Sequence, residues 1–233
     1  KARTKPKKDV PPMLLQKERE SVVEYGKKLI TSGLTKGTGG NVSVLCREKG
    51  LFALSPSGMD YFSIAPEQVA VLDLEGNVVD APCKPSTEHE LHRQLYLHRP
   101  DFAAVVHAHT DYATALSCLR QPLPALHYLV ALAGREVPCA EYATFGTPEL
   151  AQNVVRAMVD TRAVLMANHG MIAGADSLSA AFRIVEEIEY CARLYCTVLA
   201  TGRQPVLLSD AEMEKHFELF RHYGRPAQKG GNV

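Results

Sequence analysis

The chain has 233 residues, of which 46% are hydrophobic. A chain of this length can bury roughly 70% of the surface that its unfolded form exposes, so a single α/β domain needs no disulfide to stabilise it. Lys and Arg together number 26, as do Asp and Glu. This balance excludes a strong net field that would attract nucleic acid or an anionic membrane, and it favours a small-molecule partner.

Residues 1–15 begin with the basic run Lys1 to Lys8, which carries no apolar face or aromatic residue. We therefore expect a disordered tail there and a single catalytic domain over residues 16–233. The six cysteines are scattered, with no C-x-x-C pair, which favours a reducing cytoplasm. No stretch approaches the ~18 consecutive apolar residues of a membrane span. No charged-then-apolar leader opens the chain, so we expect a cytoplasmic protein with no membrane partner.

The first part of the chain combines one helix with several short strands. Apolar residues at helical spacing predict a helix over residues 16–30 that ends near Gly33. Four apolar or alternating segments, separated by turn residues, predict short strands with antiparallel neighbours. These strands cover residues 42–45, 51–54, 69–72 and 78–79.

The second part contains two continuous apolar runs, residues 103–107 and 163–167, each typical of a buried central strand that leads to a histidine. Helix-start signals precede further helices. We predict these helices from the capping-box pair Thr87 and Glu90 to about His98, from Thr147 and Pro148 to about Met158, over residues 178–200, and from Ser209 to about Tyr223. Glu88 then falls in a first helical turn.

The order of these elements indicates the fold class. Strands and helices interleave irregularly, and there are too few long crossover units for a doubly wound parallel sheet or a barrel. No internal repeat or low-complexity linker divides the chain. We therefore predict a three-layer α/β/α fold in which helices flank a mixed, largely antiparallel central sheet.

His107 and His109 provide the strongest local signal for chemistry. Alternate residues of a strand face the same side, so both imidazoles can bind one ion while Ala108 faces away. Catalytic zinc usually takes three protein ligands and keeps one position open, and His169, after the second buried strand, is the natural third ligand. The alternative is three satisfied core histidines. We predict a divalent metal site, with zinc as the ion, and interpret the other histidines as surface or packing residues: His89, His92, His98, His127, His216 and His222.

Glu88 is the candidate base, because a carboxylate near a dication and partly removed from water can accept a proton from carbon. Alone, an acid at this place is commonly a group that complements the helix dipole. Three small polar segments could together bind a phosphate through N–H groups and hydroxyls. They are residues 39–41, 57–58 and 86–87. Taken separately they are turns and caps, and neither a Walker A loop nor a G-x-G-x-x-G fingerprint is present.

Five segments occur in an order that resembles the class II aldolase/adducin family, and the match spans nearly the whole chain. They are Gly-Thr-Gly-Gly-Asn at 37–41, Ser-Pro-Ser-Gly at 55–58, Pro-Ser-Thr-Glu at 85–88, His-Ala-His at 107–109 and Asn-His-Gly at 168–170. The resemblance implies one zinc ion on His107, His109 and His169, with Glu88 as the acid/base near it. It also implies a phosphate pocket formed by Gly40, Asn41, Ser57, Gly58, Ser86 and Thr87.

The same resemblance implies that Tyr128, Phe145 and Tyr223 line the aldehyde side of the site, with a tyrosine as the proton partner of the aldehyde oxygen. It implies a homotetramer whose sites lie between subunits. The implied reaction is reversible cleavage of a ketose 1-phosphate, such as L-fuculose 1-phosphate or a 5-deoxypentulose 1-phosphate, to dihydroxyacetone phosphate and a small aldehyde. Lactaldehyde, acetaldehyde and a thioether aldehyde all fit this description.

Two kinds of relative stay open as alternatives. Sugar-phosphate 4-epimerases, dehydratases and decarboxylases of the same fold use the metal for other chemistry, but the intact Glu88 and the segment 142–147 favour an aldolase. A non-catalytic, adducin-like interaction module would need no metal. The complete set of three histidines and Glu88 argues against that module.

Overall fold

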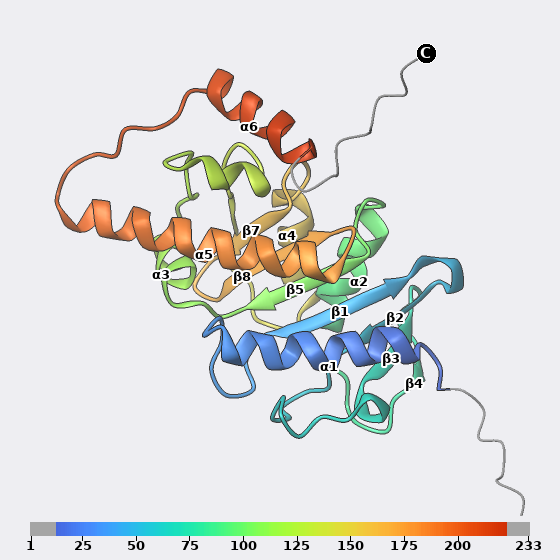
Figure 1. Cartoon of the computed structure of the whole chain (residues 1–233). Helices are drawn as coiled ribbons and strands as arrows, with labels where there is room; N and C mark the ends of the chain where they lie inside the picture. The colour runs from blue at the N-terminus through green and yellow to red at the C-terminus, as the bar shows by residue number, and fades with distance from the viewer. Residues whose placement is uncertain (1–12, 223–233) are drawn as a thin grey trace, which may run out of the picture.

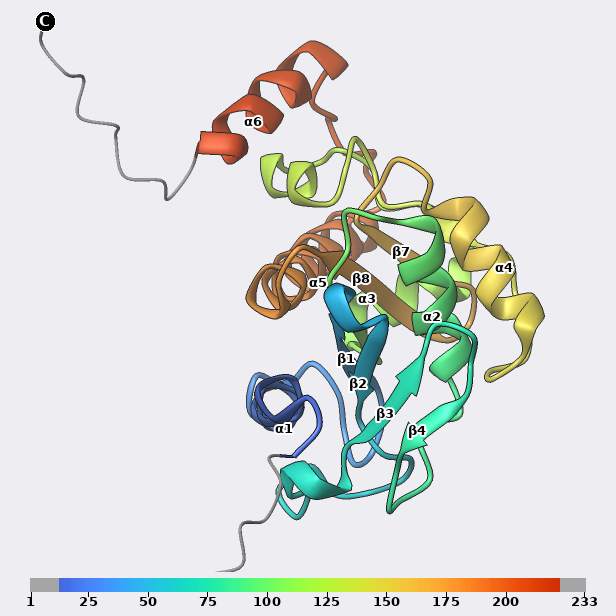
Figure 2. The ribbon, with the colours of Figure 1, turned by 90° about the vertical axis from the view of Figure 1, so that its right-hand side faces the viewer.

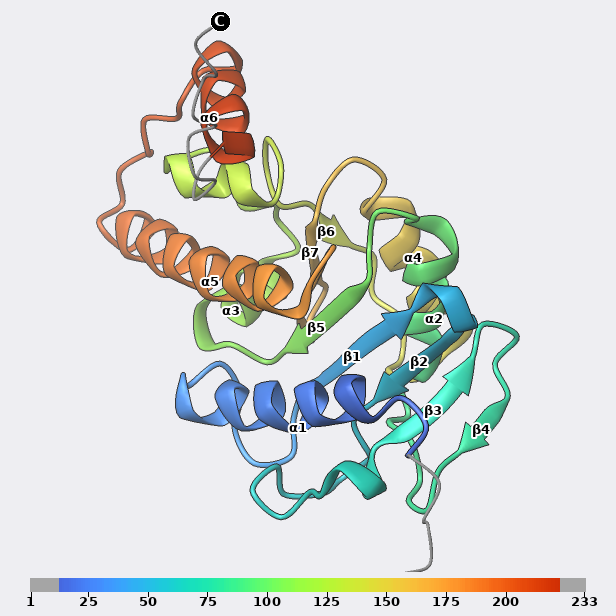
Figure 3. The same ribbon diagram turned by 45° about the vertical axis from the view of Figure 1, so that its right-hand side comes forward.

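Eight strands form one mixed sheet in the computed structural model, which describes residues 13–222 of the chain. The strands are β1 (Asn41–Cys46), β2 (Leu51–Leu54), β3 (Ala70–Asp73), β4 (Val78–Asp80), β5 (Ala104–Ala108), β6 (Cys139–Ala140), β7 (Ala163–Met166) and β8 (Gly170–Ala175). Their order across the sheet is β4-β3-β2-β1-β5-β8-β7-β6, and Figure 3 shows the run from β4 to β5. Only the β6 and β7 pair is parallel. The predicted mixed, largely antiparallel sheet is confirmed.

Helices cover both faces of this sheet, as the three-layer prediction requires. The six α-helices are α1 (Gln16–Thr31), α2 (His89–His98), α3 (Asp111–Leu119), α4 (Pro148–Ala157), α5 (Leu178–Ala200) and α6 (Asp210–His222) within the described residues. Figure 2 shows α1 and α5 on one side of the strands and α2 and α4 on the other. Helix α6 packs on the short 3-10 helix η3 (Tyr128–Leu132), outside the three layers (Figure 1).

The central strands bury side chains on both faces, which explains their continuous apolar sequences. Val106 belongs to the core formed with α1, α3 and α5, whereas its neighbour Val105 belongs to the core formed with α2 and α4. The same alternation divides Leu165 from Val164. Because successive residues of a strand face opposite sides, each apolar run supplies both cores. Strand β5 is buried along its whole length.

Of the predicted helix starts, those at Thr147 and Ser209 are confirmed, whereas the one at Thr87 is wrong. Helix α4 begins as expected, since the Thr147 hydroxyl accepts the N–H of Leu150 and Pro148 is the first helical residue. Helix α2 begins at His89, so Glu88 precedes the helix and makes no capping bond. The predicted Thr87 capping box is therefore wrong. The Glu88 side chain is instead directed into a buried polar cluster, which removes it from the first turn.

The ends of the described region bear on three expectations. Most of the expected tail of residues 1–15, together with Tyr223, lies outside the described residues. Leu15, just before α1, is buried in the core. Between residues 13 and 222, none of the helices is both long and apolar enough to span a membrane.

Arg19 of α1 joins the first helix to the sheet edge. Its side chain is only 1% exposed. The guanidinium donates to the carbonyls of Leu14 and Val69, at 2.8 and 2.7 Å, and contacts the Asp80 carboxylate on β4. A buried cation is tolerated only when its donors are paired, and here backbone carbonyls and a carboxylate do so.

We expect Arg19→Met to lower the free energy of unfolding by about 3 kcal/mol, because the carbonyls and Asp80 lose their charged partner. Urea unfolding followed by circular dichroism measures this change. Lys28→Met is the matched control, since Lys28 pairs with Glu24 on an exposed face of the same helix and such pairs contribute about 0.5 kcal/mol. Equal losses in the two variants would contradict the structural role of Arg19.

Candidate active site

Three histidines meet at one edge of the sheet. His107 lies in β5 and His109 directly follows it, whereas His169 lies in the turn between β7 and β8. Strands β5 and β7 run in the same direction because each is antiparallel to β8. The segments that follow them therefore meet, and one ligand atom from each histidine lies within 4.8 Å of the others. The predicted cluster is assembled as the strand pattern suggested.

Hydrogen bonds and close backbone contacts orient these rings. The Nδ1 of His107 lies 2.8 Å from the Met171 carbonyl and donates to it, which leaves Nε2 with its lone pair free. That Nε2 is 2.9 Å from Nε2 of His109. Gly40 has φ +69° and a Cβ there would lie 2.5 Å from the His107 carbonyl oxygen. Only glycine allows this approach.

The surroundings favour the neutral form of two of the three rings. Burial, with a further contribution from His107, lowers the pKa of both His109 and His169 to about 4. A neutral imidazole is the form that binds a metal. Three imidazoles, with a Glu88 oxygen beside them that has no hydrogen-bond partner among the described residues, fit a divalent cation.

Glu88 lies against this cluster and is 7% exposed. Its Oε1 is 3.4 Å from Nε2 of His169, and its Oε2 is 3.3 Å from Nε2 of His107. The Asn41 amide donates to Oε2 at 2.7 Å. Burial by itself raises the pKa of this carboxyl, but its interactions with the facing rings of His107 and His169 and the Asn41 hydrogen bond outweigh burial, so the pKa lies below its usual value. Glu88 is therefore ionised at neutral pH and is able to accept a proton.

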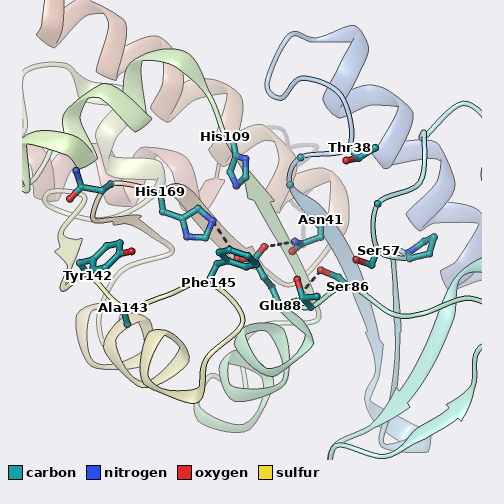
Figure 4. A pocket seen from close by; sticks show the side chains of 16 residues that line it. Thr38, Asn41, Ser57, Ser86, Glu88, His109, Tyr142, Ala143, Phe145 and His169 are labelled. Carbon is teal, nitrogen blue, oxygen red and sulfur yellow. Dashed lines mark hydrogen bonds and ion pairs between the residues drawn. The ribbon is translucent and has the colours of Figure 1, made fainter.

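A cavity of about 360 Å³ opens beside Glu88 and the histidines. This volume is within the range of roughly 300–1,000 Å³ usual for small-molecule sites. All six residues predicted to bind phosphate line it: Gly40, Asn41, Ser57, Gly58, Ser86 and Thr87. Figure 4 shows Ser57 on one side of Glu88, whereas Tyr142 and Ala143 lie on the other side, near His169. The cavity thus has a hydroxyl-rich side and a side with more carbon surface.

The predicted aldehyde residues are placed differently from one another. Phe145 lines the cavity and is 65% exposed. Tyr128 lies on η3, where its ring contacts His216 and Phe220, and it is not among the residues that line the cavity. Tyr223 lies outside the described residues. The roles assigned to these three residues stay predictions.

Sequence reasoning missed several residues of the site: Thr38, Tyr142, Ala143 and Asn168 line the cavity, and His92 lies behind it. We interpreted His92 as a surface or packing residue, but its ring is fully buried and hydrogen-bonded to Asn41 and Ser43. The available signal was its position four residues after Glu88, because residues i and i+4 share a helix face.

The comparisons with known proteins agree with this geometry. The profile of the family described as "Class II Aldolase and Adducin N-terminal domain" matches residues 20–196. The chain belongs to this family. A 5-deoxy-D-ribulose 1-phosphate aldolase of Bacillus thuringiensis is 51% identical to it, over 91% of this chain and 100% of that protein. A 5-methylthioribulose-1-phosphate/5-deoxyribulose-1-phosphate aldolase of Rhodospirillum rubrum is 40% identical, over 90% of this chain and 94% of that protein.

A solved structure gives the same result in three dimensions. The structure, named L-fuculose 1-phosphate aldolase, has 52% sequence identity and a TM-score of 0.87, and the match covers 90% of this chain and 98% of that one. The chain is therefore a class II aldolase, which makes it a lyase. The adducin-like interaction module is not supported.

The histidine cluster predicts the outcome of a single substitution. We expect His109→Ala to bind less than about a tenth of the metal that the native protein holds, because two imidazoles rarely retain such an ion. Plasma mass spectrometry after dialysis measures the metal content. His98→Ala, an exposed histidine of α2, should keep the native content. Full metal in the His109 variant would remove it from the ligand set.

Proposed function

We propose that the chain cleaves a ketose 1-phosphate reversibly to dihydroxyacetone phosphate and a small aldehyde, with zinc held by His107, His109 and His169. The observation that carries this proposal is the position of Glu88. Its buried carboxylate lies between the three histidines and a cavity that is rich in hydroxyls. When bound, the metal supplies Lewis-acid stabilisation of the negative charge that develops on the substrate oxygens.

The hydroxyl-rich side of the cavity is our proposed phosphate site. Ser57, Ser86 and Thr87 offer hydroxyls there, and Gly40 and Gly58 bring backbone close to the cavity. Hydroxyls and backbone N–H groups are common phosphate ligands. Binding the end of the substrate that does not react fixes the reacting carbons relative to Glu88, which lowers the entropic part of the barrier.

Glu88 and a tyrosine divide the proton transfers. In cleavage the C4 hydroxyl gives its proton to a tyrosine, and the ionised Glu88 takes up one proton that this tyrosine passes on through solvent. The C3–C4 bond breaks, and its electron pair stays with the three-carbon fragment as an enediolate. Protonated Glu88 then donates a proton to C3, which gives dihydroxyacetone phosphate. In synthesis the ionised Glu88 removes that proton, and a tyrosine hydroxyl protonates the aldehyde oxygen. We assign the latter role to Tyr128 or Tyr223.

We propose that this tyrosine belongs to a neighbouring subunit of a homotetramer, with sites between subunits. Tyr142 and Phe145 at the cavity mouth are 53% and 65% exposed in the single chain, and Tyr128 is 43% exposed. Aromatic side chains exposed beside a site are commonly covered by a partner.

We propose the cytoplasm as the location of the protein. The six cysteines are all unpaired, which supports a reducing compartment.

The identity of the aldehyde depends on the side of the cavity near Tyr142, Ala143 and Phe145. The substrates named for the relatives share the 1-phosphate, the C2 carbonyl and the hydroxyls at C3 and C4. They differ beyond C4, so only this side of the cavity distinguishes acetaldehyde, a thioether aldehyde and lactaldehyde. We propose a 5-deoxypentulose 1-phosphate and L-fuculose 1-phosphate as the two substrates to compare.

A coupled assay tests the reaction. We expect dihydroxyacetone phosphate, detected with glycerol-3-phosphate dehydrogenase and NADH, to form from 5-deoxyribulose 1-phosphate or L-fuculose 1-phosphate. Removal of the metal by a chelator should abolish the signal, and added zinc should restore it. Ribulose 5-phosphate is the control substrate, because its phosphate is at the other end. Epimerisation of that control, with no cleavage of either 1-phosphate, would replace the aldolase proposal with an epimerase.

A second prediction isolates Glu88. We expect Glu88→Gln to keep its metal but to lose about 10²- to 10⁴-fold in kcat, the range usual for a general acid/base. Deuterium exchange from D₂O into dihydroxyacetone phosphate should fall with it, because that exchange needs the base and no aldehyde. Glu90→Gln is the matched control, since Glu90 pairs with Arg93 on the same helix. Native exchange in the Glu88 variant would show that another group moves the proton.

A further inference from the structure

A row of buried polar side chains lies behind Glu88, between β1 and α2. Asn41 and Ser43 belong to β1, and His92 and Tyr96 belong to α2. Asn41 is 4% exposed, Tyr96 is 1% exposed, and Ser43 and His92 are fully buried. Burying four polar groups in a protein core is unfavourable unless they satisfy one another. Their contacts show that they do.

The contacts form one continuous chain of hydrogen bonds that ends on Glu88. The Tyr96 hydroxyl is 2.6 Å from Oγ of Ser43, and that Oγ is 2.6 Å from Nδ1 of His92. The Nε2 of His92 is hydrogen-bonded to Oδ1 of Asn41. The Nδ2 of Asn41 donates to Oε2 of Glu88 at 2.7 Å.

The chemistry of each group fixes the direction of the chain. A carboxylate oxygen accepts, so the NH₂ of Asn41 faces Glu88 and its carbonyl oxygen faces His92. His92 must then carry its proton on Nε2, and burial lowers its pKa to about 3, so the ring is neutral and Nδ1 accepts. Ser43 donates to Nδ1 and in turn accepts from Tyr96. Every donor therefore points toward Glu88.

We infer that Ser43, His92 and Tyr96 are positioning residues that hold the Asn41 amide and, through it, set the rotation of the Glu88 carboxylate. This inference rests on the proposed function, in which Glu88 moves the proton. Oε2 is fixed by Asn41. Among the described residues Oε1 has no hydrogen-bond partner, and it lies 3.4 Å from Nε2 of His169. The chain thus holds Oε2 by a hydrogen bond and leaves Oε1, beside His169, as the oxygen without one.

An apolar cluster would fill the same space at lower desolvation cost. Replacing a buried polar network by apolar groups of similar shape is often neutral or stabilising. Stability alone therefore does not account for four polar groups here. The need to orient the Asn41 amide does account for them. The two ends of an Asn side chain are nearly equal in shape, and only hydrogen bonds distinguish them. Without His92, the Asn41 carbonyl oxygen could turn toward Glu88 and repel it.

The test uses His92→Phe, which keeps a ring and removes both hydrogen bonds. We expect kcat and the deuterium exchange of dihydroxyacetone phosphate to fall about 10- to 100-fold, as for other groups that orient a catalytic residue, with KM and metal content unchanged. His92→Gln can still donate to Asn41, so it should recover part of the loss. In a Glu88→Gln background, His92→Phe should have no further effect, because its action passes through Glu88.

Tyr96→Phe tests the far end of the hydrogen-bond chain. It also keeps the inference testable if the His92 variant does not fold. The substitution should lower kcat by about 3- to 10-fold, less than the roughly 10- to 100-fold usual for groups next to a functional side chain, because Tyr96 lies two hydrogen bonds farther from Glu88 than His92 does. Tyr25→Phe is its matched control and should leave kcat unchanged. The ring of Tyr25 on α1 contacts Phe182 on α5, and both helices cover the face of the sheet opposite to α2. Native kcat in metal-loaded His92→Phe and Tyr96→Phe would overturn the inference.

A crystal structure of His92→Phe separates this inference from the proposed function. We expect the Asn41 amide or the Glu88 carboxylate to be rotated in that structure, whichever substrate the enzyme uses. If native protein cleaves no ketose 1-phosphate but the rotation is seen, the proposed function fails and the positioning role stands. If native protein cleaves the substrate and both side chains keep their native positions in the variant, the positioning role fails.

Discussion

The close approach of three imidazoles and one carboxylate is the constraint on which the rest of the structure depends. Both oxygens of Glu88 lie 3.3–3.4 Å from histidine nitrogens, in a space from which water is largely removed. Neutral rings do not balance a buried carboxylate, and the lowered pKa values of His109 and His169 keep those two rings neutral. A divalent cation supplies the missing positive charge, so the protein scaffold is built for an occupant of that charge.

Close backbone packing follows from this constraint. The start of β8 and the segment before β1 are both pressed against the end of β5. A Cβ at Gly170 would lie 2.6 Å from the Ala108 carbonyl oxygen, and one at Gly40 would meet the His107 carbonyl. Gly40, which suggests an anion site in the sequence, therefore has a second function. Gly40 and Gly170 let the segment before β1 and the start of β8 pack closely against the end of β5, which carries His107 and is followed by His109.

Sequence patterns predicted the parts of the site that depend on local periodicity. Strand period two placed His107 and His109 on one face, and matching apolar runs placed His169 near them. Strand β8 was missed, because its sequence of small residues and glycines lacks a β-branched run. Helix α3 was missed as well, since it is short and has no strong cap. The proposed phosphate side came from the family resemblance, because its three separate segments line one cavity only after folding.

The hydrogen-bond chain behind Glu88 shows where local patterns stop being sufficient. Asn41 and Ser43 are two residues apart on a strand, and His92 and Tyr96 are four apart on α2, with Glu88 four residues before His92 at the start of that helix. Each set therefore shares a face by its own period. Neither period tells which strand meets which helix. That pairing depends on how α2 packs on the sheet, and only the assembled fold brings the two sets of polar residues together.

The order of groups along the cavity also limits the substrate. Glu88 lies between the hydroxyl-rich side of the cavity and the side near Tyr142. A ketose 1-phosphate has the same order, because its C3 lies between the phosphate and the aldehyde portion. A ketose 5-phosphate held by the same hydroxyls also places C3 two carbons from the phosphorylated carbon. It then has a hydroxyl where the 1-phosphate has its carbonyl, and its carbonyl faces the aldehyde side instead. Because an enediolate must form next to the positive charge that stabilises it, the geometry selects the position of the phosphate before it selects the aldehyde.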